Sequence, residues 1–165
     1  MKMRSTTLIY AHRGGAALYP ENTLFAFEHA VNMGVDFIDM DICMSRDGEL
    51  IVSHSPYLAP ELTRDLQGHY LSSDTLLIKD LSVEELKRYN VGKIRPDSLK
   101  AKEFPHQHSL EQATLPTLKE VVDLAKKTSQ GLMRYQIEIK YDATQSHQYV
   151  SIKKITKTLL NFLHQ

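Results

Sequence analysis

The chain has 165 residues, with 20 Lys and Arg, 20 Asp and Glu, one cysteine and 42% hydrophobic residues. This length and composition predict a single globular domain, residues 1–165, that buries a core without an internal disulfide. The zero formal net charge excludes the broad positive field of a nucleic-acid-binding protein. Residues 1–80 carry 6 basic and 11 acidic side chains, and residues 81–165 carry 14 and 9. The acidic first half therefore suits cation ligands.

Membrane and export signals are weak in this sequence. No stretch approaches the roughly 20 apolar residues of a transmembrane helix. The apolar run before His12 is four residues long, too short for a secretory signal. We therefore expect no transmembrane segment and a cytoplasmic location, or a periplasmic one if an upstream segment is missing.

Apolar runs and turn signals predict strands that alternate with helices, which is typical of a parallel α/β sheet with helices packed outside. The predicted strands are residues 6–13, 35–43, 49–53 and 135–141. The predicted helices are residues 20–34, 82–89, 117–127 and 149–163, the second and third opened by capping boxes, Ser82 with Glu85 and Thr117 with Glu120. Residues 55–115 exceed by far the roughly 2–6 residues usual for such connections and predict an inserted lobe or lid.

Two predicted strands direct ionisable groups to one face, because successive side chains in a strand alternate between faces. One face is apolar, with Ile38, Met40, Ile42, Ile137 and Ile139. The opposite face carries Asp39, Asp41, Gln136, Glu138 and Lys140. Buried carboxylates need a partner or a metal. Asp39, Asp41 and Glu138 are therefore candidate oxygen ligands for Mg²⁺ or Ca²⁺. The alternatives are a solvated strand end for the two aspartates and a simple pair between Glu138 and Lys140.

His12 and His54 each end an apolar strand, where parallel α/β folds place functional groups. Imidazole titrates near neutrality, so the two suit a general acid and base beside a metal. Two hydrogen-bonded histidines at strand ends are the alternative. Arg13 presents a planar bidentate donor suited to phosphate, and an exposed salt-bridging arginine is its alternative.

A run of motifs connects these candidates to a known family. Residues 11–54 contain, in order, HRG, PENT, an alanine-containing helix ending in glycine, an acidic-x-Asp strand, a DG turn and a strand ending in histidine. This order closely resembles the signature of the glycerophosphodiester phosphodiesterase family. The resemblance continues over nearly the whole chain through LTRDL, LSVEELKRYNVGKIRP, LPTLKEVVDLAKK and QIEIK.

The resemblance implies a metal-dependent TIM-barrel hydrolase that cleaves small glycerophosphodiesters to sn-glycerol 3-phosphate and an alcohol. It implies His12 as acid and His54 as base, with the glycerol 2-hydroxyl as nucleophile. The other implied roles are phosphate binding by Arg13 and Lys140, metal binding by Asp39, Asp41 and Glu138, and support by Glu21 and Asn22. The family usually has Glu where Asp39 stands, which shortens one ligand by a methylene, and Asp where Ser55 stands.

A TIM barrel takes about 250 residues and eight strands. We therefore expect about the first four β/α units here, with residues 55–115 inserted after the third strand. Weak or absent hydrolysis by this portion is expected, together with a homodimer through the open edge. The alternative function is a non-catalytic half-barrel that self-associates or binds phosphate.

Overall fold

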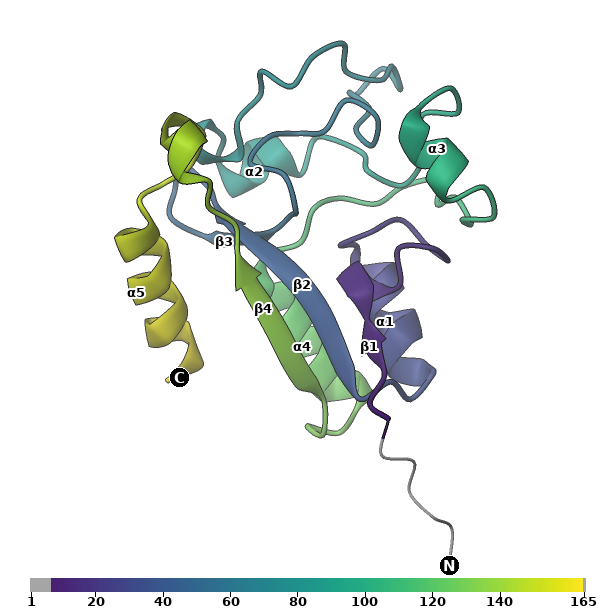
Figure 1. Cartoon of the computed structure of the whole chain (residues 1–165), viewed down its shortest axis with the longest axis vertical. Helices are drawn as coiled ribbons and strands as arrows, with labels where there is room; N and C mark the ends of the chain where they lie inside the picture. Colours follow the sequence, from purple (N-terminus) through teal and green to yellow (C-terminus); the bar gives the residue numbers. More distant parts are fainter. Residues whose placement is uncertain (1–6, 165) are drawn as a thin grey trace, which may run out of the picture.

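The structure is a computed structural model and describes residues 7–164. A central strand, β2 (Phe37–Met44), organises the sheet. It pairs in parallel with β1 (Tyr10–Ala11) along one edge and with β4 (Arg134–Ile139) along the other. The short β3 (Leu50–Val52) pairs with the end of β2 on the side opposite β4. Figure 1 shows β1 and β4 on either side of β2.

The predicted apolar face of the sheet forms the main core. Ile38, Met40 and Ile42 are fully buried against three helices. These helices are α1 (Leu24–Asn32), α4 (Leu118–Thr128) and α5 (Ile152–Leu163). No helix among residues 7–164 is long and apolar enough to cross a membrane. The alternation in the sequence therefore placed the core on the correct face of the sheet.

The signals that begin the helices are confirmed. The Thr23 side chain accepts a hydrogen bond from the Ala26 N–H at the start of α1. Both capping boxes form, one at α4 and one at α2 (Val83–Leu86). Each box satisfies backbone donors that a helix start leaves unpaired. The final helix begins at Ile152, three residues later than predicted.

Two strand predictions need correction. The strand β3 is antiparallel to β2, because the Asp47-Gly48 turn forms a tight hairpin, whereas a parallel return needs a long crossover. The described residues thus hold three parallel strands, not about four β/α units. The predicted buried strand 6–13 reduces to β1, and Leu8, Ile9 and Tyr10 are exposed because they lie along the outer edge of the sheet. Residue 6 lies outside the described part.

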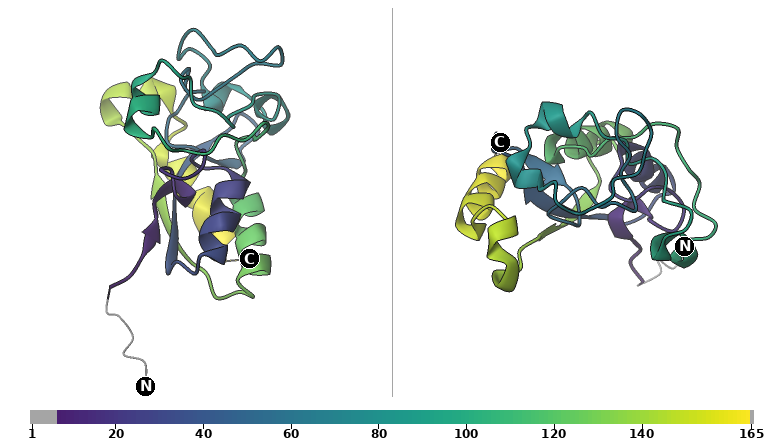
Figure 2. Two further views of the ribbon diagram at one scale, coloured as in Figure 1. Left: turned by 90° about the vertical axis from the view of Figure 1, so that its right-hand side faces the viewer. Right: turned by 90° about the horizontal axis from the view of Figure 1, so that it is seen from above.

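The lobe formed by residues 55–115 stands over one end of the sheet (Figures 1 and 2). It contains the 3-10 turn η2 (Ile78–Asp80), the helix α2 and the helix α3 (Leu99–Glu103), the last of which was not predicted. It packs on a second apolar cluster made of Cys43, Ile51, Leu58, Ile78, Leu86, Val91 and Leu115. Its location places it above the carboxyl ends of the parallel strands, where the candidate site lies.

Candidate active site

The carboxyl ends of the three parallel strands gather most of the predicted site. His12 and Arg13 follow β1 in the short turn η1 (His12–Gly14). Asp41 on β2 lies directly beside Glu138 on β4, because the two residues are partners in the strand register. Lys140 follows β4 immediately and donates its backbone N–H to Ile42. All three strands therefore contribute to one polar patch on the sheet face opposite the helices.

A strained turn positions Arg13. Its φ is 51°, in the left-handed region that few non-glycine residues adopt, and Gly14 follows with a φ of 80°. A Cβ on Gly14 would stand 3.0 Å from the Ala26 Cβ, so glycine also allows close packing on α1. The Asn22 N–H, itself in a residue of positive φ, donates to the Arg13 carbonyl at 2.9 Å. Such strain persists where surrounding structure fixes it, frequently at functional sites.

Six side chains of alternating charge form a continuous chain across the site. Its contacts are Lys100 Nζ to Glu21 Oε2 at 2.7 Å, Glu21 Oε1 to Arg13 Nη1 at 2.9 Å, Arg13 Nε to Asp41 Oδ2 at 3.3 Å, Asp41 Oδ1 to Lys140 Nζ at 3.1 Å, and Lys140 Nζ to Glu138 Oε1 at 2.6 Å. The side chains of Glu21 and Asp41 are 7% and 5% exposed. Arg13 is 14% exposed, so it is not the exposed salt-bridging arginine of the alternative.

The electrostatics follow from this chain of ion pairs. Burial acts to raise the pKa of Glu21, but the Lys100 and Arg13 cations outweigh it and hold that pKa below its usual value. Burial likewise acts to lower the pKa of Lys140, but its contacts with Glu138 and Asp41 raise it. Both groups therefore stay charged over the range where proteins work.

The two histidines have different surroundings. The Nδ1 of His12 lies 2.8 Å from Asp39 Oδ2, and the His12 ring is 66% exposed. Burial, followed by the positive charges of Arg13 and Lys140, lowers the pKa of His54 below its usual 6.5. His54 is consequently neutral near pH 7, which suits a proton acceptor, whereas His12 has a carboxylate partner that orients its ring.

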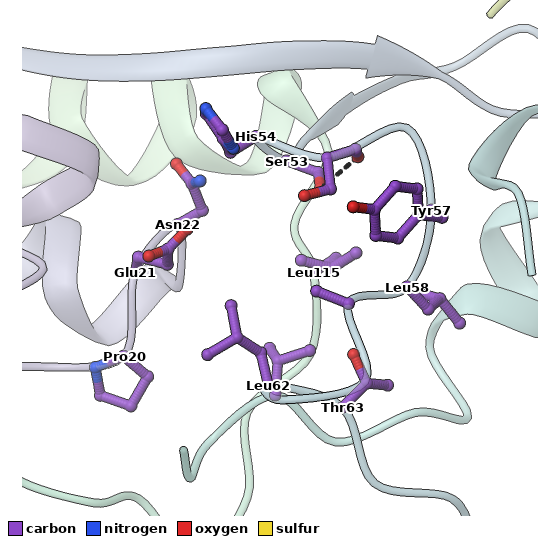
Figure 3. A pocket seen from close by; sticks show the side chains of 13 residues that line it. Pro20, Glu21, Asn22, Ser53, His54, Tyr57, Leu58, Leu62, Thr63 and Leu115 are labelled. Carbon is purple, nitrogen blue, oxygen red and sulfur yellow. Dashed lines mark hydrogen bonds between the residues drawn. The ribbon is translucent and has the colours of Figure 1, made fainter. Parts of the chain in front are cut away.

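His54 also lies between two hollows. One is mostly apolar and faces the lobe; Figure 3 shows Asn22 and His54 on one side of it and Tyr57 and Leu58 on the other. The second has a volume of about 370 Å³ and is lined by His54, Glu138 and Lys140 among other residues. In the first hollow, the Asn22 Oδ1 is buried and has no hydrogen-bond partner among the described residues. A buried acceptor without a partner costs folding free energy, so a hydrogen-bond donor of a bound ligand would be favoured at this side of the hollow.

The predicted metal ligands are only partly brought together. Asp41 and Glu138 share the Lys140 ammonium, whereas Asp39 pairs with His12. Among residues 7–164, no three His, Cys, Asp or Glu side chains are arranged to hold a metal ion. The donor set itself, carboxylate oxygens alone, has the chemistry that Mg²⁺ and Ca²⁺ prefer.

The structure thus brings six of the predicted residues together at the carboxyl end of the sheet: His12, Arg13, Asp39, Asp41, Glu138 and Lys140. Glu21, Asn22 and His54 lie around them. Lys100 was missed by the sequence analysis. It comes from the lobe, and its only local signal is Ser98, whose hydroxyl caps α3. Three parallel strands with ionisable groups at their carboxyl ends, in a sheet covered by helices on its other face, are typical of an α/β enzyme.

Comparisons with known proteins agree with this class. The sequence model of the Glycerophosphoryl diester phosphodiesterase family matches residues 12–164, and the chain belongs to that family. It is 33% identical over 136 residues to the glycerophosphodiester phosphodiesterase of Bacillus altitudinis, covering 80% of this chain and 45% of that protein. The Bacillus subtilis enzyme of the same name is 32% identical over 133 residues, covering 81% and 40%. The chain therefore spans less than half the length of these curated relatives.

Solved structures show the same fold relationship. A Silicibacter pomeroyi protein of the glycerophosphoryl diester phosphodiesterase type superposes with a TM-score of 0.87 at 28% identity, covering 96% of this chain and 54% of that one. An Oleispira antarctica phosphodiesterase, solved in complex with the product sn-glycerol-3-phosphate, superposes with a TM-score of 0.59 at 25% identity. That match covers 92% of this chain and 52% of the other.

Proposed function

We propose that this chain carries the catalytic site of a phosphodiesterase that cleaves glycerophosphodiesters to sn-glycerol 3-phosphate and an alcohol. The observation that carries the proposal is the buried Arg13 guanidinium, held by Glu21 and Asp41 within the polar patch that also contains Lys140. Family membership and the product bound to the Oleispira antarctica relative support the same reaction.

The substrate phosphate binds between Arg13 and Lys140 in this proposal. The contacts with Glu21 and Asp41 use the Nη1 and Nε of Arg13, which leaves Nη2 for an anion. A guanidinium with a fixed plane suits a phosphoryl group, and the Lys140 ammonium adds a second positive charge beside it. Glu21 and Asn22 support this loop: the first fixes the guanidinium and the second holds the Arg13 carbonyl.

His12 and His54 move the protons. His54, neutral because its pKa is lowered, accepts the proton of the glycerol 2-hydroxyl as that oxygen attacks phosphorus. The bond from phosphorus to the alcohol oxygen breaks, and His12, oriented by Asp39, donates a proton to that oxygen. The resulting cyclic phosphate is opened by water, with the two histidines in reversed roles, to give sn-glycerol 3-phosphate.

We further propose that Mg²⁺ or Ca²⁺ binds at Asp41 and Glu138, with Asp39 as the third ligand through Oδ1 while its Oδ2 keeps the contact with His12. The charge balance supports this. Four carboxylates, Glu21, Asp39, Asp41 and Glu138, face three side-chain cations, Arg13, Lys100 and Lys140. An anionic phosphodiester adds to the negative excess, and a divalent cation offsets it. When bound, the cation would stabilise negative charge on the phosphoryl oxygens.

The three parallel strands with α1, α4 and α5 are, in this proposal, the opening β/α units of a TIM barrel, and residues 55–115 are an insertion between two of them. The superposition on 54% of the Silicibacter pomeroyi chain supports this. The site lies at the carboxyl ends of the strands, which is where TIM-barrel enzymes place their catalytic groups.

Substitution of each histidine tests the assignment. We expect His12→Ala and His54→Ala each to lower the rate of glycerophosphodiester hydrolysis by ~10²-fold or more, the usual contribution of general acid–base catalysis. His147→Ala, a surface change in the 3-10 turn η3 (Ala143–Gln148), is the control and keeps the full rate. Near-normal turnover in either active-site variant would exclude that histidine from proton transfer.

The exposed edge of β1 supports a second proposal, that the chain forms a homodimer. Leu8, Ile9 and Tyr10 are 47%, 58% and 45% exposed, and within residues 7–164 no strand pairs with the outer side of β1. Unpaired apolar edges associate readily. Light scattering should give twice the chain mass at micromolar concentration and the single mass for Ile9→Lys. A wild-type monomer at all concentrations would contradict self-association.

A further inference from the structure

The lobe contacts the loop that holds Arg13 through one partly buried cation. Lys100 on α3 places its Nζ 2.7 Å from Glu21 Oε2, and its side chain is only 18% exposed. The Lys100 ammonium also lies 5.7 Å from the centre of the Phe104 ring. Since Glu21 itself is 7% exposed, this ion pair is screened from solvent much more than a surface salt bridge.

The next contact in the chain connects this pair to Arg13. Glu21 has two carboxylate oxygens, one for Lys100 and one for Arg13 Nη1. With only one cation, the buried Glu21 carboxylate would be undercompensated and free to rotate or protonate. With two cations on opposite oxygens, the plane of the carboxylate is fixed, and with it the plane of the guanidinium that it holds.

Two further contacts hold the same part of the lobe on this loop. The Gln107 side-chain amide donates to the Ala16 carbonyl at 2.6 Å, and the His108 N–H donates to the Leu18 carbonyl at 2.8 Å. The His108 ring also stacks on Tyr19 with ring centres 5.4 Å apart. These contacts hold the segment that carries Lys100 against the loop, so the fold of the lobe sets the position of Lys100.

We propose that Lys100 is a positioning residue that holds Arg13, through Glu21, in the orientation that binds the substrate phosphate. Its functional consequence rests on the proposed phosphodiesterase site; its effect on Arg13 does not. The lobe thereby acts on phosphate affinity without contacting the phosphate. Lys102, on the same short helix and exposed, forms no ion pair with any residue from 7 to 164 and supplies the matched control.

The test uses two measurements on the full chain and on Lys100→Met, Lys100→Arg and Lys102→Met. The first is the ¹⁵N NMR signal of the Arg13 Nη1–H group, the nitrogen that Glu21 contacts, which reports whether the guanidinium is fixed and protected from exchange with water. We expect a protected signal in the wild type, in Lys100→Arg and in Lys102→Met, and rapid exchange in Lys100→Met. An Arg13 signal unchanged by Lys100→Met would overturn the positioning role.

The second measurement is the calorimetric affinity for sn-glycerol 3-phosphate. We expect Lys100→Met to weaken it about tenfold, or about 1.4 kcal/mol, with Lys100→Arg restoring most of the loss. Combining Lys100→Met with Glu21→Gln should weaken it no further than either change alone, because both act on one contact chain. Equal affinity in Lys100→Met and Lys102→Met would overturn the inference. The two proposals can fail separately. If Arg13 becomes mobile in Lys100→Met but the wild type binds no sn-glycerol 3-phosphate, the positioning role of Lys100 is supported and the proposed function is contradicted.

Discussion

Asp41 and Glu138 lie side by side on neighbouring parallel strands and share one ammonium, that of Lys140, at 3.1 and 2.6 Å. The pairing lowers the pKa of Glu138, with the Lys140 hydrogen bond as its main cause and burial opposing it. A divalent cation at these two carboxylates, as proposed, would have to share them with the Lys140 ammonium or displace it.

A cation titration tests the proposed metal site at Asp41 and Glu138. We expect Mg²⁺ or Ca²⁺ to raise the melting temperature, since a ligand at a hundred times its Kd adds about 2.7 kcal/mol of stability. Asp41→Asn and Glu138→Gln should each remove most of that shift. Glu111→Gln, which changes a carboxylate 90% exposed on the lobe, should leave it intact. A wild-type melting curve indifferent to both cations would rule out the proposed metal site.

Gly14 should tolerate no side chain. Gly14→Ala places a Cβ 3.0 Å from Ala26 in a residue with a φ of 80°, so we expect a loss of about 1–3 kcal/mol from the backbone conformation and a further loss from the clash. Gly48→Ala is the control, because its φ is 87° but no described residue beyond its two chain neighbours comes within 4 Å of the added Cβ. Urea unfolding gives the loss of unfolding free energy in each variant. A smaller loss in Gly14→Ala than in Gly48→Ala would argue against close packing of Gly14 on α1.

Acid should weaken the fold partly through Glu21. Its folded-state pKa lies below the usual 4.5, so its ion pairs contribute stability that is complete above pH 4.5 and is lost as the pH falls through the lower folded-state value. In Lys100→Met the difference in unfolding free energy between about pH 7 and about pH 4 should shrink, whereas Lys102→Met keeps it. An unchanged pH dependence in Lys100→Met would show that the pair adds no linked stability.

The titration of His54 should be displaced toward acid. NMR of the imidazole protons should give a midpoint below 6.5, because burial and the charges of Arg13 and Lys140 disfavour the imidazolium. As the pH drops through that midpoint, His54 gains a proton and hydrolysis should decline with it. Lys140→Met should move the midpoint upward, and Lys153→Met, on the exposed part of α5, should not. A wild-type midpoint above 6.5 would contradict the assignment of His54 as base.

Much of this architecture could be predicted from local patterns in the sequence. The alternation of Ile38, Met40 and Ile42 with Asp39 and Asp41 follows from strand geometry alone, so the sequence predicted both faces of β2. Helix starts were equally accessible, because a capping box is a contact between residues three positions apart.

Contacts between segments far apart in the sequence could not be predicted in the same way. Alternation is the same in parallel and antiparallel strands, so it gave no direction for β3. The register that sets Asp41 beside Glu138 depends on packing between segments almost a hundred residues apart. Lys100 lies in a lobe without periodic hydrophobicity, and its contact with Glu21 arises only from the fold of that lobe.

In the proposed function, this site hydrolyses a glycerophosphodiester at phosphorus. Phosphorus NMR of the chain incubated with glycerophosphocholine and Mg²⁺ tests it most directly, since diester and monoester resonances are resolved. We predict that the diester signal declines slowly while that of sn-glycerol 3-phosphate grows, in keeping with the weak hydrolysis expected of this portion of a barrel, and that neither changes with His54→Ala. A diester signal that stays constant with the folded wild-type chain, or a product other than sn-glycerol 3-phosphate, would contradict the account.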